Sequence, residues 1–282
     1  MKTGLVLEGG GVRGIYTAGV LDVFMEHGVT FDGVIGVSAG AIHGCSYLAK
    51  QKGRSIRYYK KYCNDPRFMS FKSWLKTGDI VGADFCYRQL PDELDVYDHE
   101  AFYKNTSAFF VTCSNVETGK AEYIPINDMK TQIDFLRASA SLPYFSRIVE
   151  INEKKYLDGG CTDSIPVEAF QNMGYEKNVV ILTRDAAYRK EPEMPLMSKL
   201  CYRKFPAFTN ALLNRHTSYN QTVEKIVELE KQERIFVIRP AQPLNIGRME
   251  KDPENVQRVY DIGYADGQKY LHDMLAWLKK DS

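Results

Sequence analysis

The sequence predicts a single α/β domain over residues 1–282, with a mostly parallel sheet covered by helices on both faces. Short apolar runs rich in β-branched residues alternate with segments of helical periodicity, which is the pattern of a parallel sheet with helical crossovers. The chain shows no repeat and no linker, and its 282 residues are enough to bury a substantial core. Its composition, 44% hydrophobic and 26% charged, is typical of globular proteins and excludes a disordered chain.

Each expected element follows from a local pattern. Residues 15–26 carry apolar side chains at three- and four-residue spacing, and Gly28 follows them, as is common after the last turn of a helix. Residues 108–114 and 121–126 flank a turn at 117–120 and therefore predict a strand pair. The remaining patterns predict strands at residues 5–7, 34–37, 178–183 and 234–239, and helices at residues 39–50 and 255–280.

Composition also excludes several classes of protein. The 37 basic and 36 acidic residues leave a net charge of +1, so nothing predicts a nucleic acid as partner. No apolar stretch approaches the ~18 residues of a membrane span and no signal segment is recognisable, so a cytoplasmic protein is expected. The six cysteines lack C-x-x-C spacing and neighbouring histidine pairs, so we expect free thiols, no metal and no other cofactor; they are Cys45, Cys63, Cys86, Cys113, Cys161 and Cys201.

The first chemical motif is Gly9-Gly10-Gly11-Val12-Arg13-Gly14, which follows an expected strand and precedes an expected helix. Glycines let a ligand approach the backbone, and a helix N-terminus presents free N–H groups to an anion. These residues alone leave two interpretations open. The pattern fits a dinucleotide-binding loop, with Asp32 about 20 residues further on as the ribose-binding acid. It also fits a loop that holds the oxyanion of an acyl-transfer intermediate.

The second motif is Gly36-Val37-Ser38-Ala39-Gly40, again between an expected strand and an expected helix. This is the pattern of a nucleophile elbow, a tight turn that projects a serine hydroxyl from the edge of a sheet. Gly36 and Gly40 satisfy the need for small residues two positions before and after the serine. Ser38 is therefore the candidate nucleophile, and an N-cap role for its side chain is the structural alternative.

The third motif is Tyr156-Leu157-Asp158-Gly159-Gly160, which by itself indicates only a turn. It gains weight because a serine nucleophile needs a base, and that base is ordinarily a histidine. None of the histidines lies in a suitable motif, and His43 on the helix after Ser38 is expected to point away from it. Asp158 is therefore the candidate base. The five histidines are His27, His43, His99, His216 and His272.

Taken in this order, the three motifs resemble those of the patatin-like phospholipase family. Ala138-Ser139-Ala140-Ser141-Leu142-Pro143 and Asp163-Ser164-Ile165-Pro166-Val167 are further matches. The resemblance implies a three-layer α/β/α fold with a catalytic core over residues 4–170. Residues 171–282 are then expected to complete the sheet and its helical cover.

The resemblance also implies the chemistry of the site. It implies a Ser38–Asp158 dyad in place of a triad, an oxyanion hole from the glycine-rich loop and hydrolysis of acyl esters of lipids. We expect the amides of Gly10, Gly11 and Val12 to hold the oxyanion. Arg13 either orients that loop or forms a salt bridge at the helix start. The expected substrate is a phospholipid or a lysophospholipid.

Two further segments are relevant to how such a substrate would be bound. Residues 184–208 mix basic with apolar side chains, so they fit either an amphipathic segment that docks on an anionic membrane or a solvated helix packed on the domain. Residues 62–105 are rich in aromatics without a clean period, and either wall an acyl pocket or form a satellite core. The oligomeric state is not indicated by the sequence.

Two other functions are open. A non-catalytic lipid-binding or scaffold protein of the same fold would keep the motifs without the reaction. A dinucleotide-binding oxidoreductase would use the first glycine loop but leave Ser38 and Asp158 unexplained.

Overall fold

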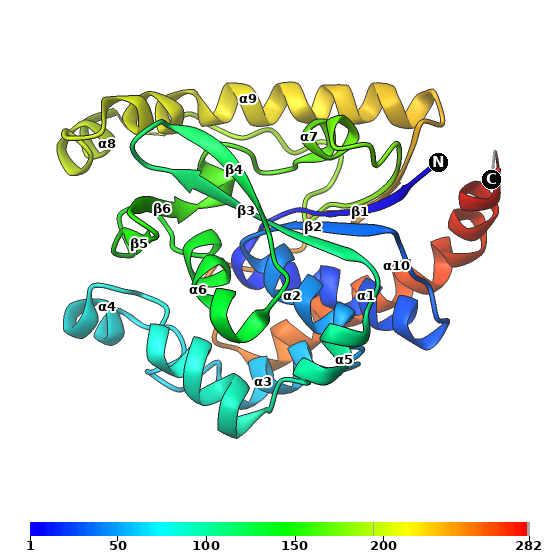
Figure 1. Cartoon of the computed structure of the whole chain (residues 1–282), viewed down its shortest axis with the longest axis horizontal. Coiled ribbons are helices and arrows are strands. Elements are labelled where there is room, and N and C mark those ends of the chain that lie inside the picture. The colour runs from blue at the N-terminus through cyan, green and yellow to red at the C-terminus, as the bar shows by residue number, and fades with distance from the viewer. Residues whose placement is uncertain (194, 281–282) are drawn as a thin grey trace.

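One eight-stranded sheet lies between two layers of helices in the computed structural model, which describes residues 1–193 and 195–280 (Figure 1). Helices α7 (Val167–Asn172) and α9 (Pro206–Lys231) cover one face. Helices α1 (Ile15–Glu26), α2 (Ala39–Leu48) and α10 (Pro253–Lys279) cover the other. This is the expected three-layer α/β/α arrangement. Met194, inside the segment 184–208, and residues 281–282 lie outside the described part.

The sheet is parallel in its middle and antiparallel at one side. Its strands follow the order β5-β6-β3-β2-β1-β7-β8, and β4 pairs with β3 outside that path. The five strands from β3 to β8 in this order are parallel neighbours, whereas β4, β5 and β6 pair in antiparallel fashion. The strands are β1 (Thr3–Leu7), β2 (Gly33–Val37), β3 (Ala108–Asn115), β4 (Lys120–Pro125), β5 (Val149–Ile151), β6 (Lys154–Asp158), β7 (Lys177–Ile181) and β8 (Ile235–Ile238).

All six expected strands and all three expected helices are present, with ends shifted by at most two residues. Strands β5 and β6 were not expected, because β5 has three residues and β6 begins with two lysines, so neither has an alternating apolar pattern. The long α9 was not expected as one element either. The remaining α-helices are α3 (Arg54–Tyr62), α4 (Phe71–Thr77), α5 (His99–Lys104), α6 (Met129–Ser139) and α8 (Pro195–Cys201), and short 3-10 or π-helical segments lie at Gly11–Gly14, Phe85–Leu94 and Gly159–Cys161.

Strands β2 and β6 share one edge of β3, and this places the second and third motifs together. β2 runs along the first part of β3 and ends with Val37 opposite Thr112. β6 runs along the last part and ends with Asp158 opposite Cys113. Since β4 occupies the other edge of β3 over residues 110–115, β2 and β6 must follow one another along the same edge. The residue after Val37 and the last residue of β6 therefore meet.

The two faces of the sheet carry separate apolar cores. In β1, Leu5 and Leu7 join the cluster under α1 and α10, whereas Val6 joins the cluster under α7 and α9. All three side chains are fully buried, as expected of a central strand covered on both faces. Among the described residues, no helix combines the length and the apolar character that crossing a bilayer requires.

Helices α1 and α10 approach each other so closely that glycine is required on both. A Cβ added at Gly19 would lie 2.3 Å from the carbonyl oxygen of Tyr260, and one added at Gly263 would lie 2.0 Å from that of Tyr16. Both obstacles are backbone atoms, which cannot rotate away. The C-terminal helix is thus docked directly on the helix that follows the glycine-rich loop.

We predict that Gly263→Ala lowers the free energy of unfolding by about 1–3 kcal/mol, because the added methyl forces two helix backbones apart. This loss occurs although alanine is by about 1 kcal/mol the better helix former. Urea unfolding would measure it. Gly247→Ala is the matched control, since its added Cβ has no neighbour closer than 3.9 Å. Equal stability of the two variants would contradict the close approach.

Candidate active site

Ser38 lies on a strained turn between β2 and α2. Its φ of 53° and ψ of −121° are unusual for a residue with a side chain. The flanking glycines are required by the backbone around them. A Cβ at Gly36 would lie 2.5 Å from the Cα of Ala41, and one at Gly40 would lie 2.4 Å from the carbonyl oxygen of Leu7. The turn thus has the geometry of a nucleophile elbow, and the Ser38 side chain makes no capping bond to α2.

Ser139, at the end of α6, connects the Ser38 turn to β3 by hydrogen bonds. The backbone N–H of Ser38 donates to Ser139 Oγ at 2.8 Å, and that hydroxyl donates to the carbonyl of Thr112 at 2.7 Å. Ser139 is fully buried. The segment 138–143, which the sequence offered only as a match to a family pattern, therefore has a structural role at this site.

Asp158 is buried beside Ser38 and is held by the turn that follows it. The N–H of Gly160 donates to Asp158 Oδ1 at 2.8 Å, and the Ser38 side chain lies next to this carboxylate in the same pocket. Burial raises the pKa of Asp158, and the charge of Arg215 and the neighbouring Ser38 hydroxyl offset this rise only in part. A raised pKa makes the carboxylate a better acceptor for the proton of a hydroxyl.

Arg215, which sequence reasoning missed, reaches the same turn from α9. Its Nε donates to the carbonyl of Gly160, and its Nη1 pairs with Glu193 at 3.3 Å. A Cβ at Gly159 would lie 2.1 Å from the carbonyl oxygen of Thr112, so this position also requires glycine. Nothing in the sequence around Arg215 indicates that it contacts Gly160, because the two residues are 55 positions apart.

The glycine-rich loop lies beside Ser38, but not all of the backbone N–H groups expected to hold the oxyanion are available. Gly9, Gly10 and Gly11 line the same small pocket as Ser38 and Asp158. The N–H of Val12 donates to the carbonyl of Arg248 at 3.3 Å, so it is not free to hold an oxyanion. Within the described residues, the N–H groups of Gly10 and Gly11 have no acceptor. These two groups are therefore the remaining candidate donors to the oxyanion.

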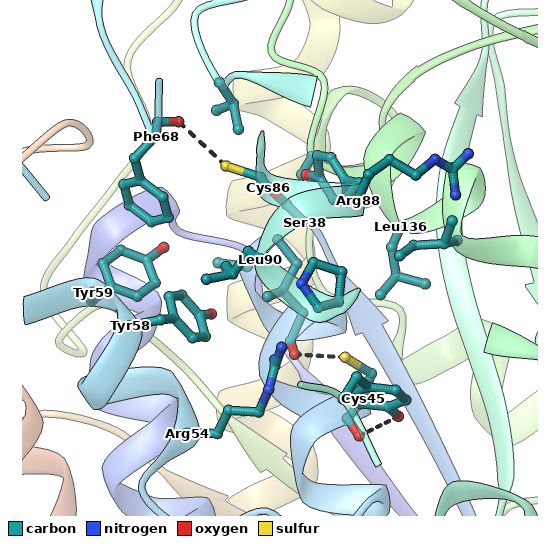
Figure 2. Close-up of a pocket in the computed structure, with 18 of the residues that line it drawn as sticks. Ser38, Cys45, Arg54, Tyr58, Tyr59, Phe68, Cys86, Arg88, Leu90 and Leu136 are labelled. Carbon is teal, nitrogen blue, oxygen red and sulfur yellow. Dashed lines mark hydrogen bonds between the residues drawn. The ribbon is translucent and has the colours of Figure 1, made fainter. Parts of the chain in front are cut away.

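A large apolar cavity opens at Ser38 (Figure 2). Its volume is about 360 Å³, within the usual range for small-molecule sites. The rings of Tyr58, Tyr59 and Phe68 lie on one side of Ser38, and Leu136 lies on the other. Its remaining walls include side chains from 62–105, so that aromatic stretch does line a cavity.

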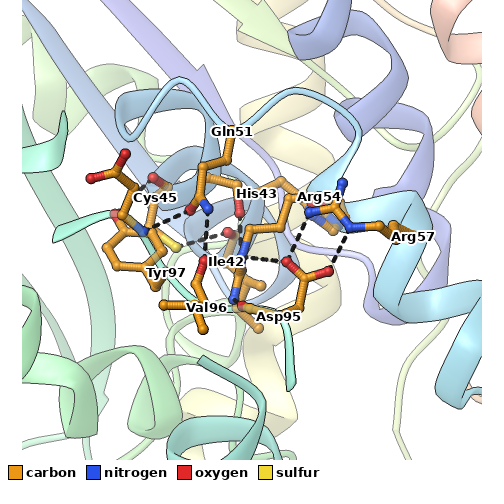
Figure 3. A network of polar contacts seen from close by, with 12 residues as sticks. Ile42, His43, Cys45, Gln51, Arg54, Arg57, Asp95, Val96 and Tyr97 are labelled. Atoms are coloured by element: carbon orange, nitrogen blue, oxygen red, sulfur yellow. Dashed lines mark hydrogen bonds and ion pairs between the residues drawn. The ribbon is translucent and has the colours of Figure 1, made fainter. Parts of the chain in front are cut away.

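A network of polar contacts holds the segment 95–98, from which Tyr97 lines the cavity (Figure 3). Arg57 forms two bonds to the Asp95 carboxylate at 2.7 and 2.8 Å, and Arg54 donates to the Asp95 carbonyl at 2.9 Å. Tyr97 donates to the carbonyl of Cys45 at 2.9 Å. Two basic side chains of α3, Arg54 and Arg57, thus bind another segment of the same chain.

A second, smaller pocket opens on the other side of Ser38 and is polar. It has a volume of about 40 Å³, and Gly11, Ser38, Leu142 and Arg248 line both it and the apolar cavity. Arg13 lines its wall, and none of its nitrogen atoms forms a salt bridge with a described residue. The salt-bridge alternative for Arg13 is therefore not observed. The other cations in this pocket are Arg184, Lys190 and Arg215.

No histidine of the chain, all five of which lie in the described part, is placed to serve as the base. His43 is buried and shares a hydrogen bond with Ser55 Oγ at 2.9 Å, and burial lowers its pKa to about 3, so the ring is neutral. His216 contacts Thr217, and His272 is exposed beside Asp273. His27 bonds to the carbonyl of Val23, and His99 packs edge-on against Tyr97.

The acid needed for dinucleotide binding is at the wrong end of the sheet. Asp32 immediately precedes β2 and accepts hydrogen bonds from the N–H and hydroxyl of Thr3, at the start of β1, at 2.7 and 2.9 Å. The glycine-rich loop follows the opposite end of β1. A ribose-binding acid belongs at the same end as that loop. This placement removes the structural basis of the oxidoreductase alternative.

We predict that Ser139→Ala lowers the free energy of unfolding by about 1–3 kcal/mol, since it leaves the buried N–H of Ser38 without an acceptor. Chemical denaturation would measure the loss. Ser141→Ala is the matched control, because in the described part of the chain the Ser141 hydroxyl bonds only to the carbonyl of Arg137 four residues earlier. A Ser139→Ala protein as stable as the control would show that the Ser139 bond does not support the turn.

Comparison with known proteins agrees with the three motifs. The sequence profile of the patatin-like phospholipase family matches residues 5–170. A second profile, described as a domain of unknown function (DUF6363), matches residues 205–279.

Several relatives align with nearly the whole chain. A protein of Escherichia coli K12 named uncharacterized protein YjjU is 28% identical over 96% of this chain and 77% of its own length. Lysophospholipase NTE1 of Eremothecium gossypii is 23% identical, and neuropathy target esterase sws of Drosophila melanogaster is 22% identical, each over 96% of this chain. The chain spans only 18% and 20% of the lengths of these two larger proteins.

Among solved structures, VipD from Legionella pneumophila aligns with 97% of this chain and 67% of its own, with a TM-score of 0.46 and 13% identity. The family itself is established by the profile, which covers more than half of the 282 residues. On that match, which contains all three motifs, the chain belongs to the patatin-like phospholipase family.

Proposed function

We propose that this chain is a serine acyl hydrolase that cleaves carboxylic esters of lipids, with Ser38 as nucleophile and Asp158 as general base. The observation that carries the proposal is the position of Ser38. It lies on a strained turn, is next to the buried Asp158 carboxylate and opens onto an apolar cavity of about 360 Å³. Relatives named lysophospholipase support the same reaction class.

The proposed mechanism follows from these positions. Asp158 accepts the proton of the Ser38 hydroxyl as Oγ attacks the ester carbonyl. The N–H groups of Gly10 and Gly11 stabilise the oxyanion, each contributing roughly 3 kcal/mol to the transition state. The carbonyl re-forms as the alcohol leaves with the proton from Asp158, and Ser38 remains acylated. Water, deprotonated by Asp158, then releases the fatty acid and restores Ser38.

The cavity favours a lipid with one acyl chain. It is a single apolar space that ends at Ser38, and the neighbouring pocket is small and polar. A lysophospholipid places its chain in the first and its alcohol part toward the second. A diacyl lipid would have to leave its second chain outside the apolar cavity. We therefore infer that lysophospholipids are better substrates than diacyl phospholipids.

We predict that Ser38→Ala abolishes hydrolysis of a p-nitrophenyl ester, and that Asp158→Asn lowers kcat by about 10²–10⁴-fold, since it removes the base. Asp163→Asn is the matched control, because Asp163 is a partly buried carboxylate whose pKa burial also raises, but it bonds to Tyr123. The control should keep its activity. Substantial hydrolysis by Asp158→Asn would contradict the dyad.

A fluorophosphonate probe separates the proposal from the alternative of a non-catalytic lipid-binding or scaffold protein. The probe reacts with an activated serine and not with an ordinary hydroxyl. It should label the wild-type chain and leave Ser38→Ala unlabelled. A wild-type chain that stays unlabelled would favour the non-catalytic alternative.

We further propose that α8 docks on an anionic lipid surface. Leu196, Met197 and Leu200 are exposed on this helix, and cationic side chains are exposed beside them. Phe205, another apolar residue of the segment 184–208, is instead partly buried against the cluster that contains Phe208. The cations on α8 or just after it are Lys199, Arg203 and Lys204.

The proposed location of the protein is the cytoplasm. The six cysteines are free thiols, which a reducing compartment such as the cytoplasm preserves.

We predict that replacing Lys199, Arg203 and Lys204 together by Gln weakens binding to anionic vesicles by about a hundredfold. Each surface cation contributes about 1 kcal/mol near such a membrane. Co-sedimentation with vesicles would measure the change, and added salt should reproduce it. The control replaces three exposed cations at the far end of α9 and beyond, Lys225, Lys231 and Arg234. Equal sedimentation of both triple variants would show that α8 is a solvated face.

A further inference from the structure

The polar pocket beside Ser38 holds more positive charge than its surroundings neutralise. Five cations line it, and the carboxylates in its lining are Glu8 and Asp158. Both carboxylates have other partners. Glu8 accepts hydrogen bonds from the N–H of Thr183 at 2.6 Å and the hydroxyl of Tyr219 at 2.7 Å. Of the five cations, Arg215 alone forms a salt bridge with a described residue. The five are Arg13, Arg184, Lys190, Arg215 and Arg248.

Two of these cations have donor atoms buried without a partner. The Nε atoms of Arg13 and Arg184 are shielded from solvent, and no described residue accepts a hydrogen bond from them. Arg13 is only 8% exposed, so water does not replace the missing partner freely. An unpaired buried donor of a charged group is costly, and an anion in the pocket would remove that cost.

The cations are brought together by elements that pack around the pocket. Arg184 stacks on Tyr188, with the guanidinium carbon 4.0 Å from the ring centroid, and Lys190 Nζ lies 4.5 Å from that of Tyr219. The backbone of Lys190 is held in both directions by Asn220 of α9, at 2.8 and 3.1 Å. Arg184 and Lys190 belong to the segment 184–208, for which the sequence leaves open a membrane-docking segment or a solvated helix packed on the domain. Both side chains line this pocket instead.

The ionisation of these groups reflects the crowding of like charges. Burial, with Arg215, Arg248 and Arg13 nearby, lowers the pKa of Lys190 to about 7. Burial, with Arg184 and Arg248 nearby, likewise lowers the pKa of Arg13 to about 10. An anion among them would favour their charged forms.

We propose that this pocket binds a phosphate group on the alcohol side of the scissile ester, so that the enzyme prefers lipids whose headgroup is a phosphate monoester. The inference rests on the proposed function. Ser38 lines both spaces, so an ester with its acyl chain in the apolar cavity directs its alcohol part toward the cations. Neither carboxylate of the lining is free to hold the ammonium of a choline headgroup, which favours an anionic headgroup over a zwitterionic one.

The first experiment compares substrates with one acyl chain and different headgroups, each below its micellar concentration. They are 1-acylglycerol, 1-acylglycerol 3-phosphate and the corresponding phosphocholine. We expect kcat/KM for the phosphate monoester to exceed that for the neutral lipid by about tenfold or more. Lys190→Met and Arg184→Met should each reduce this ratio to near one. Arg189→Met, at an exposed neighbour in the same loop, should keep the wild-type ratio.

Two outcomes separate this inference from the proposed function. Hydrolysis of all three lipids without preference, lost in Ser38→Ala, would overturn the phosphate pocket and leave the hydrolase intact. A wild-type ratio that persists in Lys190→Met and Arg184→Met would also overturn it, since the preference would then arise elsewhere.

The second experiment does not depend on turnover. Calorimetry on Ser38→Ala should detect binding of glycerol 3-phosphate, weakened about tenfold or more by Lys190→Met and unaffected by Arg189→Met. Inorganic phosphate is the comparison probe. Binding of inorganic phosphate with no lipid preference would identify a site for the free anion and overturn the headgroup assignment. Binding of neither probe would overturn the pocket, whatever esters the wild-type chain hydrolyses.

Discussion

Two strands of opposite direction end against each other on one edge of β3, and the site depends on this arrangement. β2 delivers Ser38 at its carboxyl end, and β6 delivers Asp158 at its own, opposite adjacent residues of β3. Both ends are held by backbone pairing, which is rigid and independent of side-chain rotamers. A serine and a carboxylate from distant parts of the chain are therefore brought together without a histidine between them.

Close backbone packing keeps that arrangement from relaxing. The Ser38 turn, the Asp158 turn and the crossing of α1 with α10 each place a glycine where an added Cβ would meet a backbone oxygen or Cα within about 2.5 Å. Such contacts leave little freedom for the turns to move. The strain at Ser38 is therefore maintained by its neighbours, including the bond from its N–H to Ser139.

The two halves of the chain contribute different parts of the site. The first 170 residues supply the elbow, the glycine-rich loop and the Asp158 turn, together with most of the apolar cavity. The later residues supply four of the five cations in the polar pocket: Arg184, Lys190, Arg215 and Arg248. The part matched by the family profile thus carries the groups proposed for the reaction, and the remainder shapes the side where the alcohol part lies.

The sequence by itself determined the strands and helices with strong periodic patterns and the three glycine-containing motifs. These depend on local rules of turn geometry and hydrophobic spacing, which short stretches of residues express. It did not reveal β6 as the partner of β3, the Ser139 bond or the inward orientation of Arg184 and Lys190. The bond from Val12 to the carbonyl of Arg248, which removes one expected oxyanion donor, was equally hidden. Only the tertiary structure decided these features, because each depends on residues tens to hundreds of positions apart whose approach no local pattern encodes.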